Sequence, residues 1–335
     1  MQIEHPYLMF LGDAADQLAA KTAHGIVHWR RDWCVGQLRL ADCHADLGLP
    51  DMDIPAAVAA GVRTLVIGVA NRGGIIGDSW VSTIIDAIES GMDVASGLHA
   101  GIADIPDVAA AATANRRKIF DVRHPDRSFE IGTGVRRPGK RMLAVGTDCS
   151  VGKMYAALAV EQELKARGAV CDFRATGQTG IFIAGSGVSV DAVVSDFISG
   201  ATEWLAPENE PEHWDLVEGQ GSLFHPSYAG VTMGLVHGAQ PDALVLCHEP
   251  TRTHMRGLPH QPLPGIGACL EGHLNAARLT NPDARYVGIA VNTSAMESDG
   301  ARADLLRELS QEYDLPAVDP VRDGVAPIVD LLEAI

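Results

Sequence analysis

The chain has 335 residues, of which 47% are apolar and 35 are glycine, and its net charge is −17 from 26 basic and 43 acidic residues. This length is typical of about two domains of ordinary size. The strong negative charge argues against binding to nucleic acid or to an anionic membrane. The six cysteines lie apart without a CxxC pair, and no apolar run approaches the about 20 residues of a membrane span, so we expect a cytoplasmic protein without zinc site or disulfides.

Residues 1–138 alternate between short apolar runs and helical patterns. Residues 63–70 form a β-branched run, which is typical of a buried parallel strand. Residues 78–91 place apolar side chains at helical spacing and end at a glycine. Further elements are expected as strands at 6–12, 92–97 and 118–123 and as helices at 14–29 and 104–117. This alternation predicts an N-terminal, Rossmann-like, doubly wound domain.

The best domain boundary lies in residues 130–141, a stretch rich in glycine, proline and positive charge. We place the break near Gly139, which gives one domain over 1–138 and a second over 139–335. The second domain repeats the alternation, with strands expected at 142–146, 169–177, 214–219, 243–250 and 285–292 and helices at 153–168, 300–313 and 324–335. The chain is therefore predicted to be an α/β protein throughout.

Residues 144–155, AVGTDCSVGKMY, follow a strand and open a helix, as a phosphate-binding P-loop does. Backbone N–H groups and the positive helix end would converge on phosphate oxygens, and Lys153 would add a point charge. Met154 replaces the hydroxyl that completes a magnesium shell, so we expect a P-loop NTPase-like domain that binds phosphate without that metal ligand. A glycine turn with a surface lysine is the alternative. The expected cofactor-binding residues are Gly146, Thr147, Asp148, Cys149, Ser150, Val151, Gly152, Lys153 and Met154.

The strings GTDCSVGKM and VEGQGS resemble the dethiobiotin-synthetase-like branch of P-loop proteins, in which a strand-end glutamate, here Glu218, faces the phosphates. With ATGQTGIFIAGSG, CHEPTRTHMRG and ANRGG, they make nearly the whole chain similar to the DUF1611 family. This resemblance implies an N-acetyltransferase that moves an acetyl group from acetyl-CoA to the amine of D-glutamate or a related D-amino acid. Coenzyme A carries phosphates, and acyl transfer needs no metal at them, which would account for the missing hydroxyl.

The transfer that this resemblance implies needs a base for the amine and a donor or cation for the developing oxyanion. Glu218, at the carboxyl end of a strand, is our first candidate for the base. The alternative is a buried carboxylate that balances the charge of Lys153. His225 is the second catalytic candidate, and Lys153 completes the set. Cys149, in the loop at a helix N-terminus, could have a lowered pKa and form an acetyl-cysteine intermediate.

Two loops are expected to bind the substrate. Residues 247–257 contain imidazole, carboxylate and guanidinium groups close together in the sequence. The alternatives are a metal site, a solvated loop, or arginines that bind a substrate carboxylate, and we favour the last. Residues 69–79 offer an arginine beside two glycines, either to hold a glutamate side chain or merely to turn the chain. The substrate-binding candidates are Arg72, Gly73, Gly74, His248, Glu249, Arg252, His254 and Arg256, and no metal ligand is assigned.

Two further segments could meet the acyl donor. The glycine-rich residues 176–187 suit its pantetheine or acyl group, and a basic linker could meet the 3′-phosphate or be solvated. The linker consists of Arg136, Arg137, Lys140 and Arg141.

Two other functions remain open from the sequence. One is a Mg-ATP-dependent ligase or kinase of the dethiobiotin-synthetase type, with Asp148 and Glu218 in place of the missing metal ligand. The other is a non-catalytic nucleotide sensor. The expected partners are an acidic D-amino acid and further copies of the chain in a homo-oligomer, with neither nucleic acid nor membrane.

Overall fold

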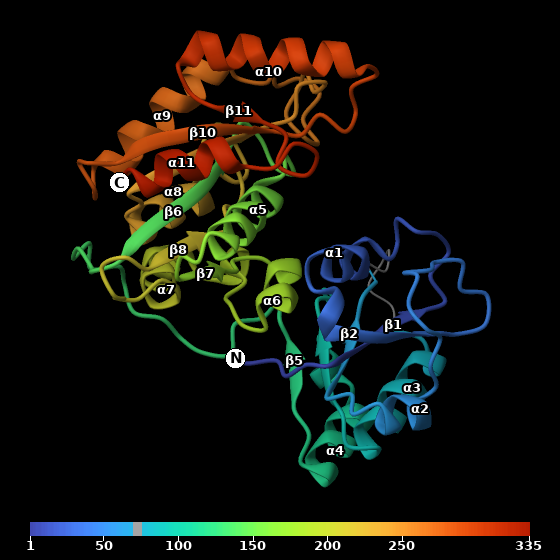
Figure 1. Cartoon of the computed structure of the whole chain (residues 1–335). Helices are drawn as coiled ribbons and strands as arrows, with labels where there is room; N and C mark the ends of the chain where they lie inside the picture. The colour runs from blue at the N-terminus through green and yellow to red at the C-terminus, as the bar shows by residue number, and fades with distance from the viewer. Residues whose placement is uncertain (70–75) are drawn as a thin grey trace. The chain divides into compact units, whose positions relative to one another are not determined.

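The computed structural model describes residues 1–69 and 76–335, and the chain forms two compact units (Figure 1). The first unit comprises Met1–Asp126 and Gly177–Ala192, and the second comprises Arg127–Thr176 and Val193–Ile335. Each contains one parallel sheet with helices packed on it, which confirms the expected α/β class. Because the units are discontinuous, they differ from a single cut after residue 138, and the predicted limits 1–138 and 139–335 stay a prediction. No helix among the described residues is long and apolar enough to cross a membrane.

The sheet of the first unit has five strands among the described residues. The strands of this sheet are β1 (Tyr7–Gly12), β2 (Cys34–Arg39), β3 (Thr64–Ile67), β4 (Asp93–Ser96) and β5 (Ile119–Asp121). They pair in the order β2-β1-β3-β4-β5, which is that of a doubly wound sheet. The helices of this unit are α1 (Lys21–Trp29), α2 (Ile54–Ala59), α3 (Asp78–Glu89), α4 (Pro106–Asn115) and α6 (Gln178–Ala184).

Strand β2 was not predicted, because its sequence CVGQLR lacks the apolar run of a buried parallel strand. The polar residue Gln37 is nevertheless 1% exposed. Its amide nitrogen donates to the carboxylates of Asp46 and Asp51 at 2.9 and 3.1 Å, and its oxygen accepts from the Leu47 N–H at 2.8 Å. These bonds satisfy the side chain inside the unit, so a polar residue is tolerated in the strand.

Helix α6 corrects the prediction of a glycine-rich loop over residues 176–187. It packs on α1, and the Tyr7 hydroxyl donates to the Phe182 carbonyl oxygen at 3.2 Å. The helix ends at Gly185 with φ +73°, and the carbonyl oxygen of Gly185 accepts from the Ile3 N–H at 2.7 Å. This segment therefore completes the first unit, although the chain on both sides of it belongs to the second.

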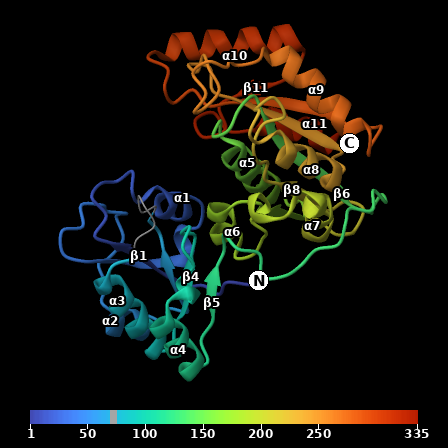
Figure 2. The ribbon, with the colours of Figure 1, turned by 180° about the vertical axis from the view of Figure 1, so that it is seen from behind.

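The second unit contains the sheet that positions the phosphate loop. The strands of this sheet are β6 (Lys140–Gly146), β7 (Cys171–Arg174), β8 (Trp214–Val217), β9 (Ala243–His248), β10 (Arg285–Val291) and β11 (Ala317–Val318). They pair in the order β11-β10-β9-β6-β8-β7, all parallel. The helices are α5 (Lys153–Ala166), α7 (Ile198–Leu205), α8 (Ala229–Ala239), α9 (Ile266–Arg278), α10 (Asp299–Tyr313) and α11 (Ala326–Glu333). Figures 1 and 2 show this unit from opposite sides.

The chain order reverses at β6, which lies between β8 and β9. One face of the sheet, formed by residues such as Leu143 and Val145, packs on Val236 of α8 and Ala276 of α9 in one apolar cluster. Helix α5 packs against β6, β7 and β8, and α11 lies beside it. In parallel α/β sheets, ligands bind outside the carboxyl ends of the strands where the order reverses. The topology therefore points to the loop that follows β6.

Close packing at this point requires a glycine at position 219. A Cβ atom there would lie 1.7 Å from the carbonyl oxygen of Ala144 and 3.0 Å from Cδ of Lys153. The strand end of β8 thus lies directly against β6 and the loop lysine, and no larger side chain fits without backbone movement.

We expect Gly219→Ala to destabilise the second unit by about 3 kcal/mol. The added methyl group would clash with backbone atoms, which cannot move aside as a flexible side chain can. This loss of stability corresponds to a fall of at least about 6 °C in the thermal unfolding midpoint. The matched control is Gly230→Ala in α8, where an added Cβ would meet nothing within 4 Å and should leave the midpoint unchanged or raise it. Equal midpoints for the two variants would contradict the close packing of Gly219.

Candidate functional site

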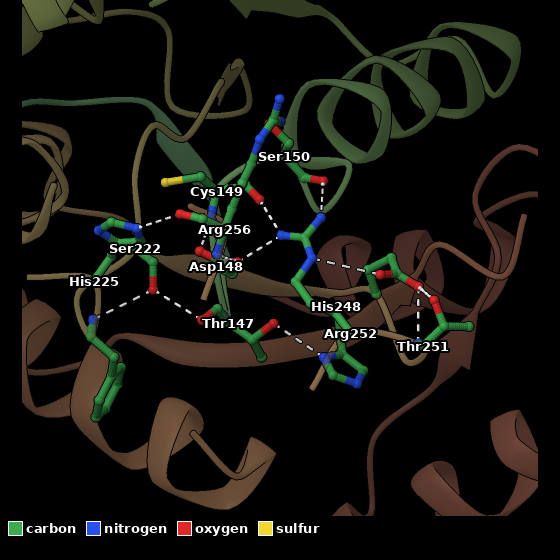
Figure 3. Close-up of polar contacts among 12 residues, drawn as sticks. Thr147, Asp148, Cys149, Ser150, Ser222, His225, His248, Thr251, Arg252 and Arg256 are labelled. Atoms are coloured by element: carbon green, nitrogen blue, oxygen red, sulfur yellow. Dashed lines mark hydrogen bonds and ion pairs between the residues drawn. The ribbon is translucent and has the colours of Figure 1, made fainter. Parts of the chain in front are cut away.

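The candidate site is the loop between β6 and α5, at the carboxyl end of the central strand (Figure 3). The Thr147 N–H donates to the Cys247 carbonyl oxygen at 3.0 Å, so the pairing of β6 with β9 continues into the loop. Ser150 and Gly152 have φ angles of 53° and 100°. Left-handed residues in such a loop arrange successive N–H groups as an anion-binding nest. A left-handed serine is strained, which is typical of functional loops.

The N-terminus of α5 has features typical of an anion-binding site. Gly152 is the N-cap, no side chain of the described residues caps the helix, and its first turn contains no acidic residue. The N–H groups of that turn have no acceptor within the helix, and the helix dipole makes this end positive. Together with the loop, these groups have the arrangement expected of a phosphate site, and the binding of a phosphate there stays a prediction.

Lys153 lies beneath the loop rather than on the surface, so the alternative of a surface lysine is wrong. Its side chain is buried, and Nζ donates to the Asp148 carbonyl oxygen at 2.8 Å. Burial lowers the pKa of Lys153, whereas Cys247, Cys149, Asp148 and Glu218 act in the opposite direction. An added anion would offset the cost of burying this charge.

Asp148 holds the loop to the segment that follows β9. It is fully buried, and Oδ1 accepts from the Cys149 N–H at 2.6 Å. Oδ2 accepts from Nη1 of Arg252 and from the Arg256 N–H, both at 2.7 Å. Both carboxylate oxygens are therefore occupied by donors of the protein itself.

The guanidinium group of Arg252 is directed at the loop (Figure 3). Besides Asp148, it reaches the carbonyl oxygens of Cys149 at 2.6 Å and Ser150 at 3.3 Å. Nη1 of Arg256 contacts Oγ of Ser150. The structure thus gives these arginines a role in loop conformation that the sequence analysis missed, and their predicted contact with a substrate carboxylate stays a prediction.

Of the other candidates in the 247–257 segment, His248 contacts the loop, and Glu249 and His254 contact their chain neighbours. Nδ1 of His248 lies 3.1 Å from Oγ1 of Thr147, and burial lowers the pKa of His248. The Glu249 carboxylate accepts from the hydroxyl and N–H of Thr251 at 2.6 and 2.9 Å. His254 is exposed and bonds to its neighbour Thr253 at 2.8 Å. A substrate role for His248, Glu249 and His254 also stays a prediction.

Glu218 lies at the carboxyl end of β8 with 4% of its surface exposed. Its Oε2 accepts from the Thr176 N–H at 2.9 Å, and the Thr176 hydroxyl donates to the Glu218 carbonyl oxygen at 2.6 Å. Its charge acts on Lys153, as expected for a carboxylate beside the loop lysine. The position is compatible with both predicted roles, a base and a charge partner for Lys153.

His225 connects two loops through both ring nitrogens. Nδ1 accepts from the Ser227 N–H at 3.2 Å, so the ring proton lies on Nε2, which donates to the Arg256 carbonyl oxygen at 3.2 Å. A base needs a nitrogen lone pair that is not already engaged. This geometry favours a positioning role for His225, whose catalytic role stays a prediction.

Two expectations about charge are corrected. Burial raises the pKa of the Cys149 thiol, and the nearby cations only partly oppose this, so the expected lowering was wrong. The basic linker lies at the amino end of β6, a strand of seven residues, and is thus about 20 Å from the loop. Arg141 is fully buried and donates to the Arg137 carbonyl oxygen at 2.6 Å, so the linker neither reaches a phosphate at the loop nor is fully solvated.

The structure does not describe every candidate. Arg72, Gly73 and Gly74 lie outside the described residues, so their predicted substrate contacts stay predictions. The ligand atoms of Asp148, Cys149 and His225 lie within 4.8 Å of one another. A cation there would have to displace the donors that already occupy the Asp148 carboxylate.

Polar groups at the ends of β10 and β11 were not among the residues predicted for the site. Thr293 follows β10, and its N–H and hydroxyl donate to Asp319, which follows β11, at 3.1 and 2.5 Å. The signal was present, because the run 285–292 was predicted as a parallel strand and polar residues follow it directly.

Fold and loop together define a two-domain α/β protein whose second domain carries a P-loop without the usual magnesium-binding hydroxyl. Residues 130–329 match the P-loop domain described as DUF1611_C, and residues 38–125 match the Rossmann-like domain described as DUF1611_N. The chain belongs to the DUF1611 family, which confirms the resemblance found in the sequence.

Three relatives cover nearly the whole chain. A D-glutamate N-acetyltransferase from Tritonibacter scottomollicae is 56% identical over 99% of this chain and 100% of that protein. A D-glutamate N-acetyltransferase from a Pseudoalteromonas species is 49% identical over 98% of this chain and 99% of that protein. The crystal structure of a DUF1611 family protein from Anabaena variabilis superposes with a TM-score of 0.84 at 30% identity, covering 99% of this chain and 100% of that one.

We expect Arg252→Ala to destabilise the protein by about 3 kcal/mol, because it leaves the buried carboxylate of Asp148 without its cation. The same variant should weaken the binding of pyrophosphate, measured by titration calorimetry, because the loop carbonyls lose their common donor. Arg307→Ala is the matched control, since Arg307 is 60% exposed on α10 and pairs only with Asp304 among the described residues.

A double variant, Asp148→Ala with Arg252→Ala, should lose less stability than the sum of the two single changes, because neither charge is then buried alone. Additive losses in the unfolding midpoint would contradict the proposed coupling of the two side chains.

Proposed function

We propose that this chain transfers an acetyl group from acetyl-CoA to the amine of D-glutamate. The observation that carries this proposal is identity of 56% and 49% to two D-glutamate N-acetyltransferases over nearly the full length of all three proteins. The preference for the D-enantiomer comes from those two relatives, since no described contact of this chain reads the chirality of a ligand.

The phosphate loop supports acetyl-CoA as the donor. Its N–H groups, the uncapped start of α5 and Lys153 form a site for the pyrophosphate of coenzyme A. Met154 offers no oxygen for magnesium, and acetyl transfer requires none at the phosphates. In this role the loop anchors the donor, while the bond change takes place at the acetyl carbon.

The reaction joins the amine nitrogen of D-glutamate to the acetyl carbon and breaks the bond from that carbon to sulfur. The ammonium form of the substrate must lose a proton before attack, and the departing thiolate must gain one. Glu218 is our candidate for the group that accepts the proton, because it lies at the carboxyl edge of the sheet next to Lys153. Lys153 and the loop N–H groups bind negative charge, and His225 positions the loops around them.

The ATP-using alternative has less support from the site. It requires oxygen ligands for Mg²⁺, and we considered Asp148 and Glu218 as substitutes for the missing hydroxyl. Both oxygens of Asp148 already accept hydrogen bonds from Cys149, Arg252 and Arg256. A nucleotide sensor without activity would bind the same phosphates but would not explain the identity to two acetyltransferases.

The carboxylates of D-glutamate are assigned to Arg72, Gly73, Gly74 and the 247–257 segment, on the strength of their residue types alone. We further propose that the protein is cytoplasmic and forms a homo-oligomer, for which light scattering in solution is the direct measurement.

The direct test is release of free thiol when the protein is mixed with acetyl-CoA and D-glutamate. We expect turnover in the presence of EDTA, and at least about tenfold less with L-glutamate, which mispositions its amine. Hydrolysis of ATP that requires Mg²⁺, without thiol release from acetyl-CoA, would contradict the proposal.

Lys153→Met keeps the length of the side chain but removes its charge. We expect KM for acetyl-CoA to rise about 10- to 100-fold, because the variant loses one charge-assisted contact with the donor. The effect on KM for D-glutamate should be smaller. Lys165→Met on the same helix is the control, since Lys165 is half-exposed and pairs with Glu161. An effect confined to KM for D-glutamate would mean that the loop binds the amino acid instead.

A further inference from the structure

A cavity of about 380 Å³ adjoins the phosphate loop within the second unit. It is bounded by Val151, Gly152 and Tyr155 at the start of α5 and by the residues that follow β10 and β11. Its volume lies in the range of about 300–1,000 Å³ that is typical of small-molecule sites. A group attached to a phosphate in the loop can therefore continue directly into this cavity.

The walls of the cavity suit a flat heteroaromatic ring. Val151, Tyr155, Ala290, Pro320 and Val321 contribute apolar surface, and its lining is mostly apolar. Three polar residues that follow β10 supply hydrogen-bonding groups, namely Asn292, Thr293 and Ser294. A mostly apolar pocket with a few convergent polar groups is the usual environment of a nucleobase or cofactor ring.

Asp319 makes this cavity a preformed site. The side chain is 6% exposed, and Oδ2 accepts from the N–H and hydroxyl of Thr293. Oδ1 accepts from the N–H groups of Val321 and Arg322 at 3.0 and 3.2 Å. One buried carboxylate thus joins the loop after β10 to the loop after β11, so both walls are held before any ligand binds.

Two arginines of the cavity share one carboxylate. Arg302 and Arg322 line the cavity, and Nη1 of each lies 2.9 Å from Oδ1 of Asp299. Asp299 is 76% exposed, so its contribution to stability is small, and an incoming anion can replace it. Nε of Arg302 is buried without a hydrogen-bond partner among the described residues, which leaves a further donor. An exposed anion between two guanidinium groups marks a place that suits a phosphate.

We propose that this cavity binds the 3′-phosphoadenosine end of the acyl donor, with the adenine between the apolar walls and the 3′-phosphate on Arg302 and Arg322. The inference rests on the proposed function, because it names the donor's binding site. It also replaces the basic linker as the candidate for the 3′-phosphate, since the linker lies at the opposite end of β6.

The test compares two probes that differ only in the 3′-phosphate, adenosine 3′,5′-bisphosphate and adenosine 5′-monophosphate, by titration calorimetry with EDTA present. We expect the wild type to bind the bisphosphate at least about tenfold more tightly, as for a phosphate held by arginine. Arg322→Ala should abolish that preference, and Asp299→Asn should increase it by removing the competing carboxylate. Arg307→Ala on α10 is the matched control and should change nothing, since neither Arg307 nor its partner Asp304 lines the cavity.

Enzyme kinetics provide the second measurement. Arg322→Ala should raise KM for acetyl-CoA at least about tenfold while kcat stays the same, because a remote phosphate contributes equally to ground-state and transition-state binding. With 3′-dephospho-acetyl-CoA the variant and the wild type should have equal KM.

The two proposals fail in different ways. Two results would overturn the cavity assignment alone. One is thiol release with the same KM for acetyl-CoA in the wild type and in Arg322→Ala. The other is equal affinity of the wild type for both probes. Absence of thiol release, with probe binding that still depends on Arg322, would overturn the acetyl transfer and leave the cavity assignment standing.

Discussion

The buried carboxylate of Asp148 carries the contacts on which the candidate site depends. It accepts from the Cys149 N–H within its own loop and from Arg252 and the Arg256 N–H of the segment after β9. Such a group is costly to bury unless every oxygen is satisfied, so the three donors and the carboxylate hold one another in place. The loop conformation, including its left-handed Ser150, is therefore determined by a partner segment some 100 residues away in the sequence.

The residues of this loop differ from those of a magnesium-dependent NTPase. In those proteins the oxygen after the lysine and an acidic side chain hold the metal. In this chain Met154 occupies the first position, and the carboxylate of Asp148 within the loop accepts hydrogen bonds from Cys149, Arg252 and Arg256. The N–H groups of the loop and the buried Lys153 are the groups to which we assign phosphate binding. This difference is the basis of our proposal that the loop binds a phosphate-bearing acyl donor.

Much of the architecture could be predicted from the sequence. Short apolar runs, whose length is typical of parallel strands, alternate with segments of helical periodicity. The strand–loop–helix around Lys153 was correct for that reason. Elements with mixed patterns were missed, such as β2, whose buried Gln37 is satisfied only by residues of a later turn. The segment 176–187 was expected as a loop because of its glycines, yet its apolar face finds a partner in the first unit and forms α6.

Predicting the site was harder than predicting the fold. The residue types around the loop were recognised, but sequence could not indicate that Arg252 faces Asp148 or that both nitrogens of His225 are engaged. Those facts depend on long-range packing, which no local pattern records. The cavity beside α5 was overlooked for the same reason, since its walls come from segments around residues 151, 293 and 321 that only the sheet order brings together.

The central claim is that the loop anchors the pyrophosphate of coenzyme A without a metal while acetyl transfer takes place elsewhere. A crystal structure of the protein with coenzyme A and D-glutamate, grown in EDTA, tests it most directly. The account predicts pyrophosphate oxygens on the N–H groups of residues 149–153 and on Nζ of Lys153. Coenzyme bound at another place, with this loop empty, would contradict it.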